Sequence, residues 1–185
     1  MKRFLGLSII LLNGWPGLPP VAVAAEGRLI AVVLANDSPR YRDIHAVFIE
    51  KAQSFCADSC KIYVQTPNSD VMSLRNSVRK AVALGSDLIV TYGPSATLAA
   101  KAETPPVPIL FADVYDPAKL QLVSAKTGLG RNMSGVRGDA PVQALFKYFL
   151  EATDARSLAV LYDKKSPEGR LQKETLEKSA QRRHV

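Results

Sequence analysis

The stretch Asp87-Leu-Ile-Val-Thr-Tyr-Gly-Pro-Ser-Ala-Thr-Leu-Ala-Ala, residues 87–100, decides the fold class of this 185-residue chain. It predicts an apolar strand that ends before Gly93 and a helix whose first residue is Pro94. The first turn of a helix carries unpaired N–H groups and partial positive charge, so the turn around Ser95 and Ala96 can hold a carboxylate or a phosphate. An ordinary strand-to-helix turn without a ligand would give the same pattern.

Strands and helices alternate around this stretch. Strands are expected at 29–34, 61–65, 88–91 and 107–111, and the first of them is a continuous apolar run, as in a strand buried on both faces. The helix after Pro39 is expected to bury a stripe made of Ile44, Val47, Phe48, Ala52 and Phe55. This order predicts an α/β fold with a doubly wound parallel sheet. The loops at 36–38, 92–96 and 112–117 should then meet at the carboxyl edge of the sheet.

The N-terminus has the pattern of a secretory signal peptide, assigned here to residues 1–25. Lys2 and Arg3 precede an apolar run, 4–12, that is too short to span a bilayer. Ala22-Val23-Ala24 is an A-x-A cleavage site, and cleavage after Ala25 is equally compatible with the pattern. The mature protein is therefore expected in the periplasm or otherwise outside the cytoplasm.

Composition narrows the possible functions. The formal net charge is +7, and many basic residues crowd the last 22 positions without interleaved aromatic residues, which is typical of a solvated helix and not of a nucleic-acid site.

Cys56 and Cys60 can form a short-range disulfide in an oxidising compartment or remain free thiols. His45 and His184 are isolated, so neither a metal site nor a cofactor is expected.

The pattern loosens around four glycines within residues 128–138, which favours a crossing between two lobes. We therefore divide the mature chain into a first α/β lobe, 26–132, and a crossover with an incomplete second α/β lobe, 133–185. The second region should hold a helix capped by Asp139, a strand at 157–162 and a charged helix from Ser166. One strand and two helices cannot bury a core of their own. The sequence is thus expected to be truncated in its second lobe, or else this region packs onto the first.

Taken in order, these segments resemble the substrate-binding proteins of ABC importers with the type I periplasmic-binding-protein fold, in particular the branch that binds aromatic amino acids. The segments that carry the resemblance are 30–37 (IAVVLAND), 87–96 (DLIVTYGPSA), 107–117 (VPILFADVYDP), 132–136 (NMSGV) and 157–162 (SLAVLY). The resemblance implies a cleft between two lobes that closes on a small-molecule ligand, and a permease in the membrane as partner.

The resemblance also implies roles for particular residues. Ser95 and the N–H groups of Ser95 and Ala96 would bind a ligand carboxylate, and Gly93 would let the ligand approach the backbone. Asp113 and Tyr115 would meet an amino group and an aromatic ring. The further residues expected to line the cleft are Asn36, Tyr92 and Asp116, although Asn36 can instead cap a helix, Asp116 can belong to a turn, and Tyr92 and Tyr115 can be wall packing.

Two other classes of function remain open from the sequence. An extracytoplasmic sensor domain of a signalling protein would share the same fold and would differ by a membrane span downstream. A small secreted α/β enzyme would need a catalytic set, but no G-x-S-x-G motif is present and neither histidine is placed near Ser95 by the pattern. The sequence therefore favours a non-enzymatic solute-binding protein whose ligand carries a carboxylate, most simply an amino acid.

Overall fold

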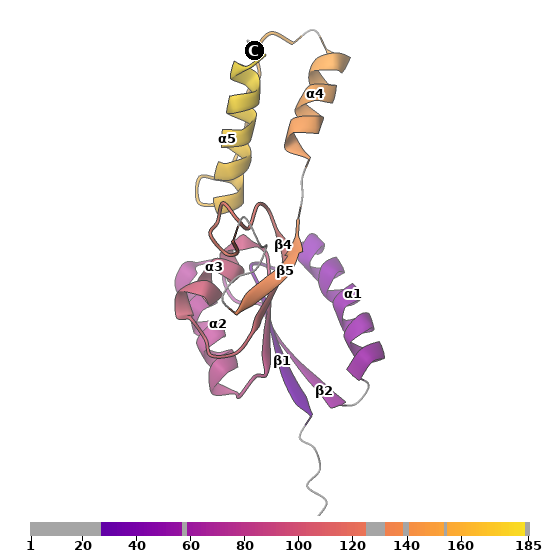
Figure 1. The fold of residues 1–185 in the computed structure, drawn as a ribbon, viewed down its shortest axis with the longest axis vertical. Helices are drawn as coiled ribbons and strands as arrows, with labels where there is room; N and C mark the ends of the chain where they lie inside the picture. Colours follow the sequence, from indigo (N-terminus) through magenta and orange to yellow (C-terminus); the bar gives the residue numbers. More distant parts are fainter. Residues whose placement is uncertain (1–26, 57–58, 125–131, 139–140, 154, 184–185) are drawn as a thin grey trace, which may run out of the picture.

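The computed structural model describes residues 27–56, 59–124, 132–138, 141–153 and 155–183 (Figure 1). The expected signal peptide, 1–25, and the expected helix cap Asp139 lie outside these ranges. Among the described residues, no helix is long and apolar enough to cross a membrane.

The described strands form one parallel sheet in the order β2-β1-β3-β4-β5, with β1 and β3 at its centre. Helix α1 lies on one side of this sheet, and α2 and α3 lie together on the other (Figure 1). The predicted doubly wound α/β arrangement is therefore confirmed. The strands are β1 (Arg28–Leu34), β2 (Cys60–Gln65), β3 (Leu88–Tyr92), β4 (Ile109–Val114) and β5 (Met133–Arg137), and the helices are α1 (Pro39–Cys56), α2 (Val71–Ala83), α3 (Pro94–Glu103), α4 (Val142–Ala152) and α5 (Pro167–Gln181).

The core follows from the two central strands. β1 and β3 are covered on both faces, so almost every side chain along them is apolar and buried, including Val32, Val33, Ile89 and Val90. Residues such as Leu74 and Val78 of α2 complete the layer on one side. The buried sheet is the rigid base that holds the loops at its carboxyl edge.

Helix α1 confirms the expected apolar stripe only in part. Tyr41 is buried, and Ile44 and Phe48 pack against the core, whereas Val47 is 58% exposed and Phe55 is 88% exposed. The buried residues follow the i, i+3, i+7 spacing that starts at Tyr41, so the polar-looking first turn of α1 belongs to the buried stripe. The prediction is therefore confirmed for Ile44 and Phe48 and wrong for Val47 and Phe55.

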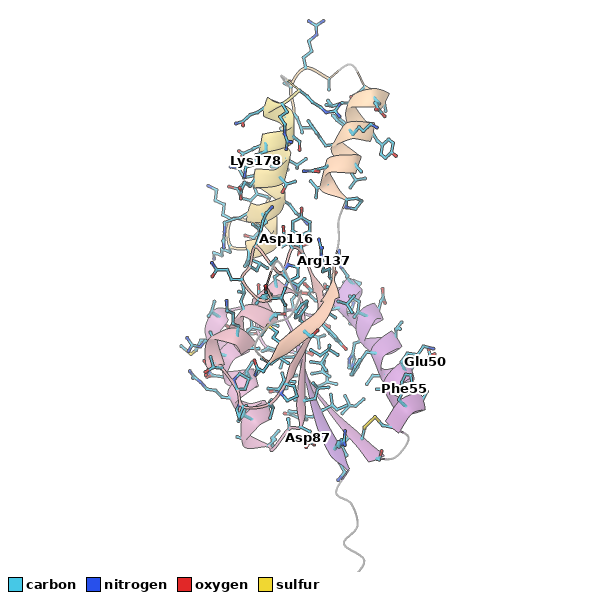
Figure 2. All side chains as sticks on the ribbon, viewed as in Figure 1. Glu50, Phe55, Asp87, Asp116, Arg137 and Lys178 are labelled. Atoms are coloured by element: carbon cyan, nitrogen blue, oxygen red, sulfur yellow. A yellow bond between two sulfur atoms is a disulfide. The ribbon has the colours of Figure 1, made fainter. Side chains whose placement is uncertain are left out.

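A disulfide joins the end of α1 to the start of β2. Cys56 and Cys60 are bonded, with their Cα atoms 5.5 Å apart, which resolves the alternatives that the sequence left open. Figure 2 shows the bond close to Phe55, at the amino end of the sheet. Closing so short a loop stabilises the fold by about 2 kcal/mol on the chain-entropy model.

The glycine-rich segment contributes a strand and not only a crossing. Met133–Arg137 forms β5, which pairs in parallel with β4, so the first sheet extends past the boundary expected at residue 132. Gly135 permits this pairing, because a Cβ there would overlap the ring and carbonyl of Phe111. The strand is short and polar at an edge of the sheet, and its sequence therefore lacks the apolar pattern of the central strands.

Beyond the sheet, α4 and α5 lie side by side (Figure 1). Of the described residues on α4, only Phe146 is buried, and Leu145 is exposed. The strand expected at 157–162 is not formed: these residues join no sheet, and the Leu161 side chain is fully exposed. A β-strand needs a neighbouring strand for its N–H and C=O groups, and no described strand lies beside this segment.

Candidate functional site

The candidate site is the carboxyl edge of the sheet. The first loop along the chain at this edge is the one after β1. The Oδ1 atom of Asn36 accepts a hydrogen bond from the N–H of Ser38 (3.0 Å). The Ser38 carbonyl in turn accepts the N–H of Tyr41 (3.1 Å), so Ser38 is the cap of α1. Asn36 thus holds the loop in shape, with its side chain half-buried at the edge.

The turn between β3 and α3 is built around Gly93. Its φ is 84° and its ψ is 163°, a conformation that only glycine adopts readily, and its N–H donates to the Ala112 carbonyl (2.9 Å). A Cβ at this position would overlap the Tyr41 hydroxyl. The glycine is therefore required both by the backbone and by the close approach of α1.

Ser95 is the polar side chain that this turn offers. It is half-exposed, and its hydroxyl makes no hydrogen bond to another residue in the described part of the chain, whereas Ala96 is fully buried. The helix has no side-chain cap at Gly93, so the N–H groups of its first turn are left without a capping side chain. These are the features that an anion-binding turn needs.

Tyr92 lies beneath α1 and not on the open edge. Its side chain is fully buried, its hydroxyl is 3.2 Å from Nδ1 of His45, and its ring meets Phe48 edge-to-face. Burial raises the pKa of the Tyr92 hydroxyl and lowers that of the His45 imidazole. This pair packs α1 onto the sheet next to the turn.

Asp113 occupies a bulge at the end of β4. The pairing with β5 shifts register between Ala112 and Val114, and Asp113 has a φ of 58°. Its carboxylate forms an ion pair with Nη2 of Arg40, from the first turn of α1. Gly138 leaves room for that carboxylate, since a Cβ there would overlap Asp113 Oδ1. Asp113, expected to meet a ligand amino group, is thus held by a cation of its own chain.

The ion pair of Arg40 with Asp113 lies among groups whose pKa values are shifted. The hydrogen bond that the Arg40 guanidinium donates to the Asp113 carboxylate raises the pKa of Arg40. Burial, aided by the negative charges of Asp113 and Glu168, raises the pKa of Tyr41 to about 12. Burial also raises the pKa of Glu168, which lies in the first turn of α5. The N-terminus of α5 therefore faces the corner that α1 and β4 form.

Tyr115 and Asp116 line a cleft of about 540 Å³ between the sheet edge and the two outer helices. Asp116 is held in place by its own turn: its Oδ1 accepts the N–H of Lys119 (3.1 Å), and its Oδ2 pairs with the Lys119 ammonium (3.3 Å). Arg137 and Lys178 face the same cleft, and Figure 2 shows Asp116 and Arg137 at the top of the sheet with Lys178 above them on α5.

A larger cavity, of about 820 Å³, lies beside the amino ends of β4 and β5. Among the described residues that line it, the one titratable side chain is Lys101, whose ammonium donates to the Gln121 carbonyl (2.7 Å). Its other polar lining residues are Thr104, Gln121, Ser124 and Asn132, and the Asn132 amide donates to the carbonyls of Pro105 and Val107. Within the described ranges, no group of three His, Cys, Asp or Glu side chains is arranged to hold a metal ion.

The structure thus brings most of the expected residues to one edge. Asp113 lies at the end of β4, Ser95 and Ala96 lie in the first turn of α3, and the segments after β1, β3 and β4 supply Asn36, Gly93, Tyr115 and Asp116. Tyr92 belongs to the same edge but turns inward. Sequence reasoning assigned no role in the site to Arg40 or Tyr41, nor to the basic groups of Arg137 and Lys178. The proximity of Arg40 to Asp113, 73 positions apart in the chain, has no signal in a single sequence.

Comparison with solved structures identifies the fold, although no protein-family model and no curated protein matches the chain. A conserved domain protein from Vibrio cholerae is 20% identical with a TM-score of 0.78, over 85% of this chain and 55% of that one. An ABC domain from Streptococcus pneumoniae, solved in complex with L-Trp, is 22% identical with a TM-score of 0.75, over 86% and 55%. A leucine-binding protein from Thermotoga maritima is 16% identical with a TM-score of 0.64, over 82% and 45%.

The chain therefore spans about half the length of the structures that it matches. The likeness extends over more than four-fifths of this chain. At this level of identity the likeness establishes the fold alone. The chain has the α/β fold of the type I periplasmic-binding proteins, as the sequence resemblance predicted.

Proposed function

We propose that this chain is the solute-binding component of an ABC importer and that it binds a small carboxylate-bearing ligand, an amino acid, at the carboxyl edge of its sheet. The observation that carries the proposal is the turn at Gly93 to Ala96, which offers an unengaged Ser95 hydroxyl and the first turn of α3 to an anion. Two neighbours with the same fold support the class of ligand, because one was solved with L-Trp and another is a leucine-binding protein.

Each part of the edge has a place in this proposal. Ser95 binds the ligand carboxylate through its hydroxyl and N–H, with Ala96 contributing its N–H, while Gly93 keeps the approach to the backbone open. Tyr115 lies in the cleft and offers an aromatic surface to the ligand side chain. Asn36 and Asp116 shape the flanking loops through their own hydrogen bonds.

Titration calorimetry with L-tryptophan and L-leucine tests the proposal. Ser95→Ala should weaken binding by about 1–3 kcal/mol, because a hydrogen bond to a charged group is lost. Ser95→Asp should abolish binding, since it places a negative charge where the carboxylate sits. The matched control is Ser54→Asp on α1, an exposed serine at the opposite end of the sheet, which should leave binding unchanged. Normal binding by Ser95→Asp would refute the anion-binding role of the turn.

The location of the protein and its permease partner belong to the same proposal. A solute-binding component must work outside the cytoplasm, and the pattern of residues 1–25 is that of an export signal. Intact-mass measurement of protein recovered from the periplasm should show a chain that starts at Ala25 or Glu26. Recovery of a chain that still starts at Met1, embedded in the membrane, would contradict it.

A further inference from the structure

We propose that Arg40 is a specificity-determining residue of this site and that its guanidinium binds the carboxylate of the ligand together with the Ser95 turn. This inference rests on the proposed function and names a group that sequence reasoning did not assign.

Arg40 reaches from α1 to the end of β4 at the carboxyl edge. It lies in the first turn of α1, directly after β1, and its Nη2 atom pairs with the Asp113 carboxylate at the end of β4. Asp113 follows Ala112, whose carbonyl accepts the N–H of Gly93 (2.9 Å). The guanidinium is therefore anchored one residue away from the strand position that holds the Ser95 turn.

The anchor is a built feature of the fold. Asp113 is the extra residue of a β-bulge, has a φ of 58°, and its side chain is only 9% exposed. A bulge re-aims a side chain, and a left-handed conformation at a residue other than glycine is strained, so the surrounding structure must hold it in place. Gly138 leaves the space that the carboxylate fills. The chain thus tolerates strain in order to point this carboxylate at Arg40.

The guanidinium itself remains accessible. The Arg40 side chain is 60% exposed, and its one hydrogen bond to a described residue uses a single N–H of the five that arginine carries. Fixed by a nearly buried carboxylate, the planar group is pre-organised to receive a second carboxylate through its remaining donors. The neighbouring pair of Arg42 and Asp37 differs, because both partners are more than half exposed and neither is strained.

The ligand class that fits is a small molecule with a free carboxylate. Asp113 is already neutralised by Arg40, and the nearby Glu168 carboxylate hydrogen-bonds with Gln172 and not with Arg40, so the remaining donors of the guanidinium stay available to a ligand carboxylate. An incoming carboxylate meets the open side of the guanidinium and the first turn of α3. Removal of the carboxylate from the ligand should therefore matter more than removal of its amino group.

Calorimetric titration of the whole chain with three probes tests this: L-tryptophan, indole-3-propionate, which keeps the carboxylate alone, and tryptamine, which keeps the ammonium alone. Arg40→Gln should weaken the binding of both carboxylates roughly ten- to a hundred-fold, as the loss of a charge-assisted contact does, and leave that of tryptamine unchanged. Arg40→Lys should recover only part of the loss, since it keeps the charge without the fork. Arg42→Gln is the matched control and should have no effect.

A double variant separates recognition from neutralisation. Arg40→Gln combined with Asp113→Asn removes both charges, so Asp113 is no longer left unpaired. The carboxylates should still bind weakly to this protein. Recovery of wild-type affinity would overturn the inference, because Arg40 would then serve only to neutralise Asp113. Circular dichroism of each variant checks that the fold is intact.

The remaining outcomes distinguish the two proposals. If L-tryptophan binds and Arg40→Gln binds it as well as Arg42→Gln does, the inference about Arg40 is wrong while the proposed function stands. If indole-3-propionate binds through Arg40 and no L-amino acid binds, the amino-acid function fails and the inference stands. If no carboxylate binds to the wild-type chain, both are refuted.

Discussion

Replacing Gly93 by alanine should destabilise the fold more than any other glycine-to-alanine change at a turn of positive φ in the described chain. Two costs add at this position. An L-residue at a φ of 84° and a ψ of 163° costs about 1–3 kcal/mol. The new Cβ would also overlap the Tyr41 hydroxyl and approach the Ala35 Cβ to 3.2 Å, and such overpacking costs about 1–3 kcal/mol more.

Gly85 provides a matched control for the steric part of this cost. It also has a positive φ, of 74°, but a Cβ there would have no atom within 4 Å. Gly85→Ala should therefore cost only the conformational part, about 1–2 kcal/mol. Urea unfolding followed by circular dichroism measures both losses, provided that the slope against denaturant is the same in both variants.

The difference between the two variants decides whether the reasoning is correct. We expect Gly93→Ala to lose about 1–3 kcal/mol more than Gly85→Ala. Adding Tyr41→Phe should reduce that excess, since it removes the atom closest to the new methyl group, and a double-mutant cycle measures the coupling. Equal losses in the two glycine variants would mean that α1 does not press on the turn as the structure shows.

Three further predictions concern stability. Cys56→Ser combined with Cys60→Ser should lower the free energy of unfolding by about 2 kcal/mol in urea titrations, and an unchanged value would mean that the bond constrains nothing. Glu103 accepts hydrogen bonds from two arginines of α2, and these bonds lower the pKa of its carboxyl group. Its contribution to stability is therefore present above the ordinary glutamate pKa and is lost as the pH falls through the lowered pKa. Glu103→Gln should remove this acid sensitivity when the free energy of unfolding is measured against pH. In hydrogen-exchange mass spectrometry, residues 155–162 should exchange much faster than β3, because they join no sheet, and equal protection would contradict this.

Most strands of the sheet could be predicted from the sequence, because buried parallel strands have a distinctive composition. The runs at 29–34 and 88–91 are apolar on both faces, and the structure places them at the two central positions. β5 was missed for the converse reason. It is a short strand with polar residues at an edge, and its pairing depends on the close approach that Gly135 allows, which no local pattern reveals.

Helix α1 shows how periodicity can mislead. Tyr41 and His45 are not counted as apolar in a simple reading, yet they belong to the buried stripe with Phe48. Both are amphipathic side chains that bury a ring and keep a polar atom partnered, as the contact between His45 and Tyr92 shows. The predicted stripe therefore included Val47 and Phe55, which lie outside the face of α1 that packs on the sheet.

The candidate site was predictable in its location but not in its pairings. Topology alone brings the ends of β1, β3 and β4 to one edge, so Asn36, Ser95 and Asp116 could be grouped from the sequence. The ion pair of Arg40 with Asp113 could not be foreseen, because it depends on the bulge that turns Asp113 towards α1. The sequence shows which side chains are charged, whereas the ion-pair partner of each one depends on the fold.

The geometry of the carboxyl edge therefore depends on the position of the first turn of α1. Consecutive residues of α1 contact the two unusual backbone positions: Tyr41 lies against Gly93, and Arg40 holds Asp113. Those positions are linked, because the Gly93 N–H donates to the carbonyl of the residue before Asp113. Ser38 caps this helix at the edge, and the disulfide ties its far end to β2. A shift of α1 would thus move the proposed carboxylate contacts of Arg40 and the Ser95 turn together, which makes the first turn of α1 part of the site and not merely its support.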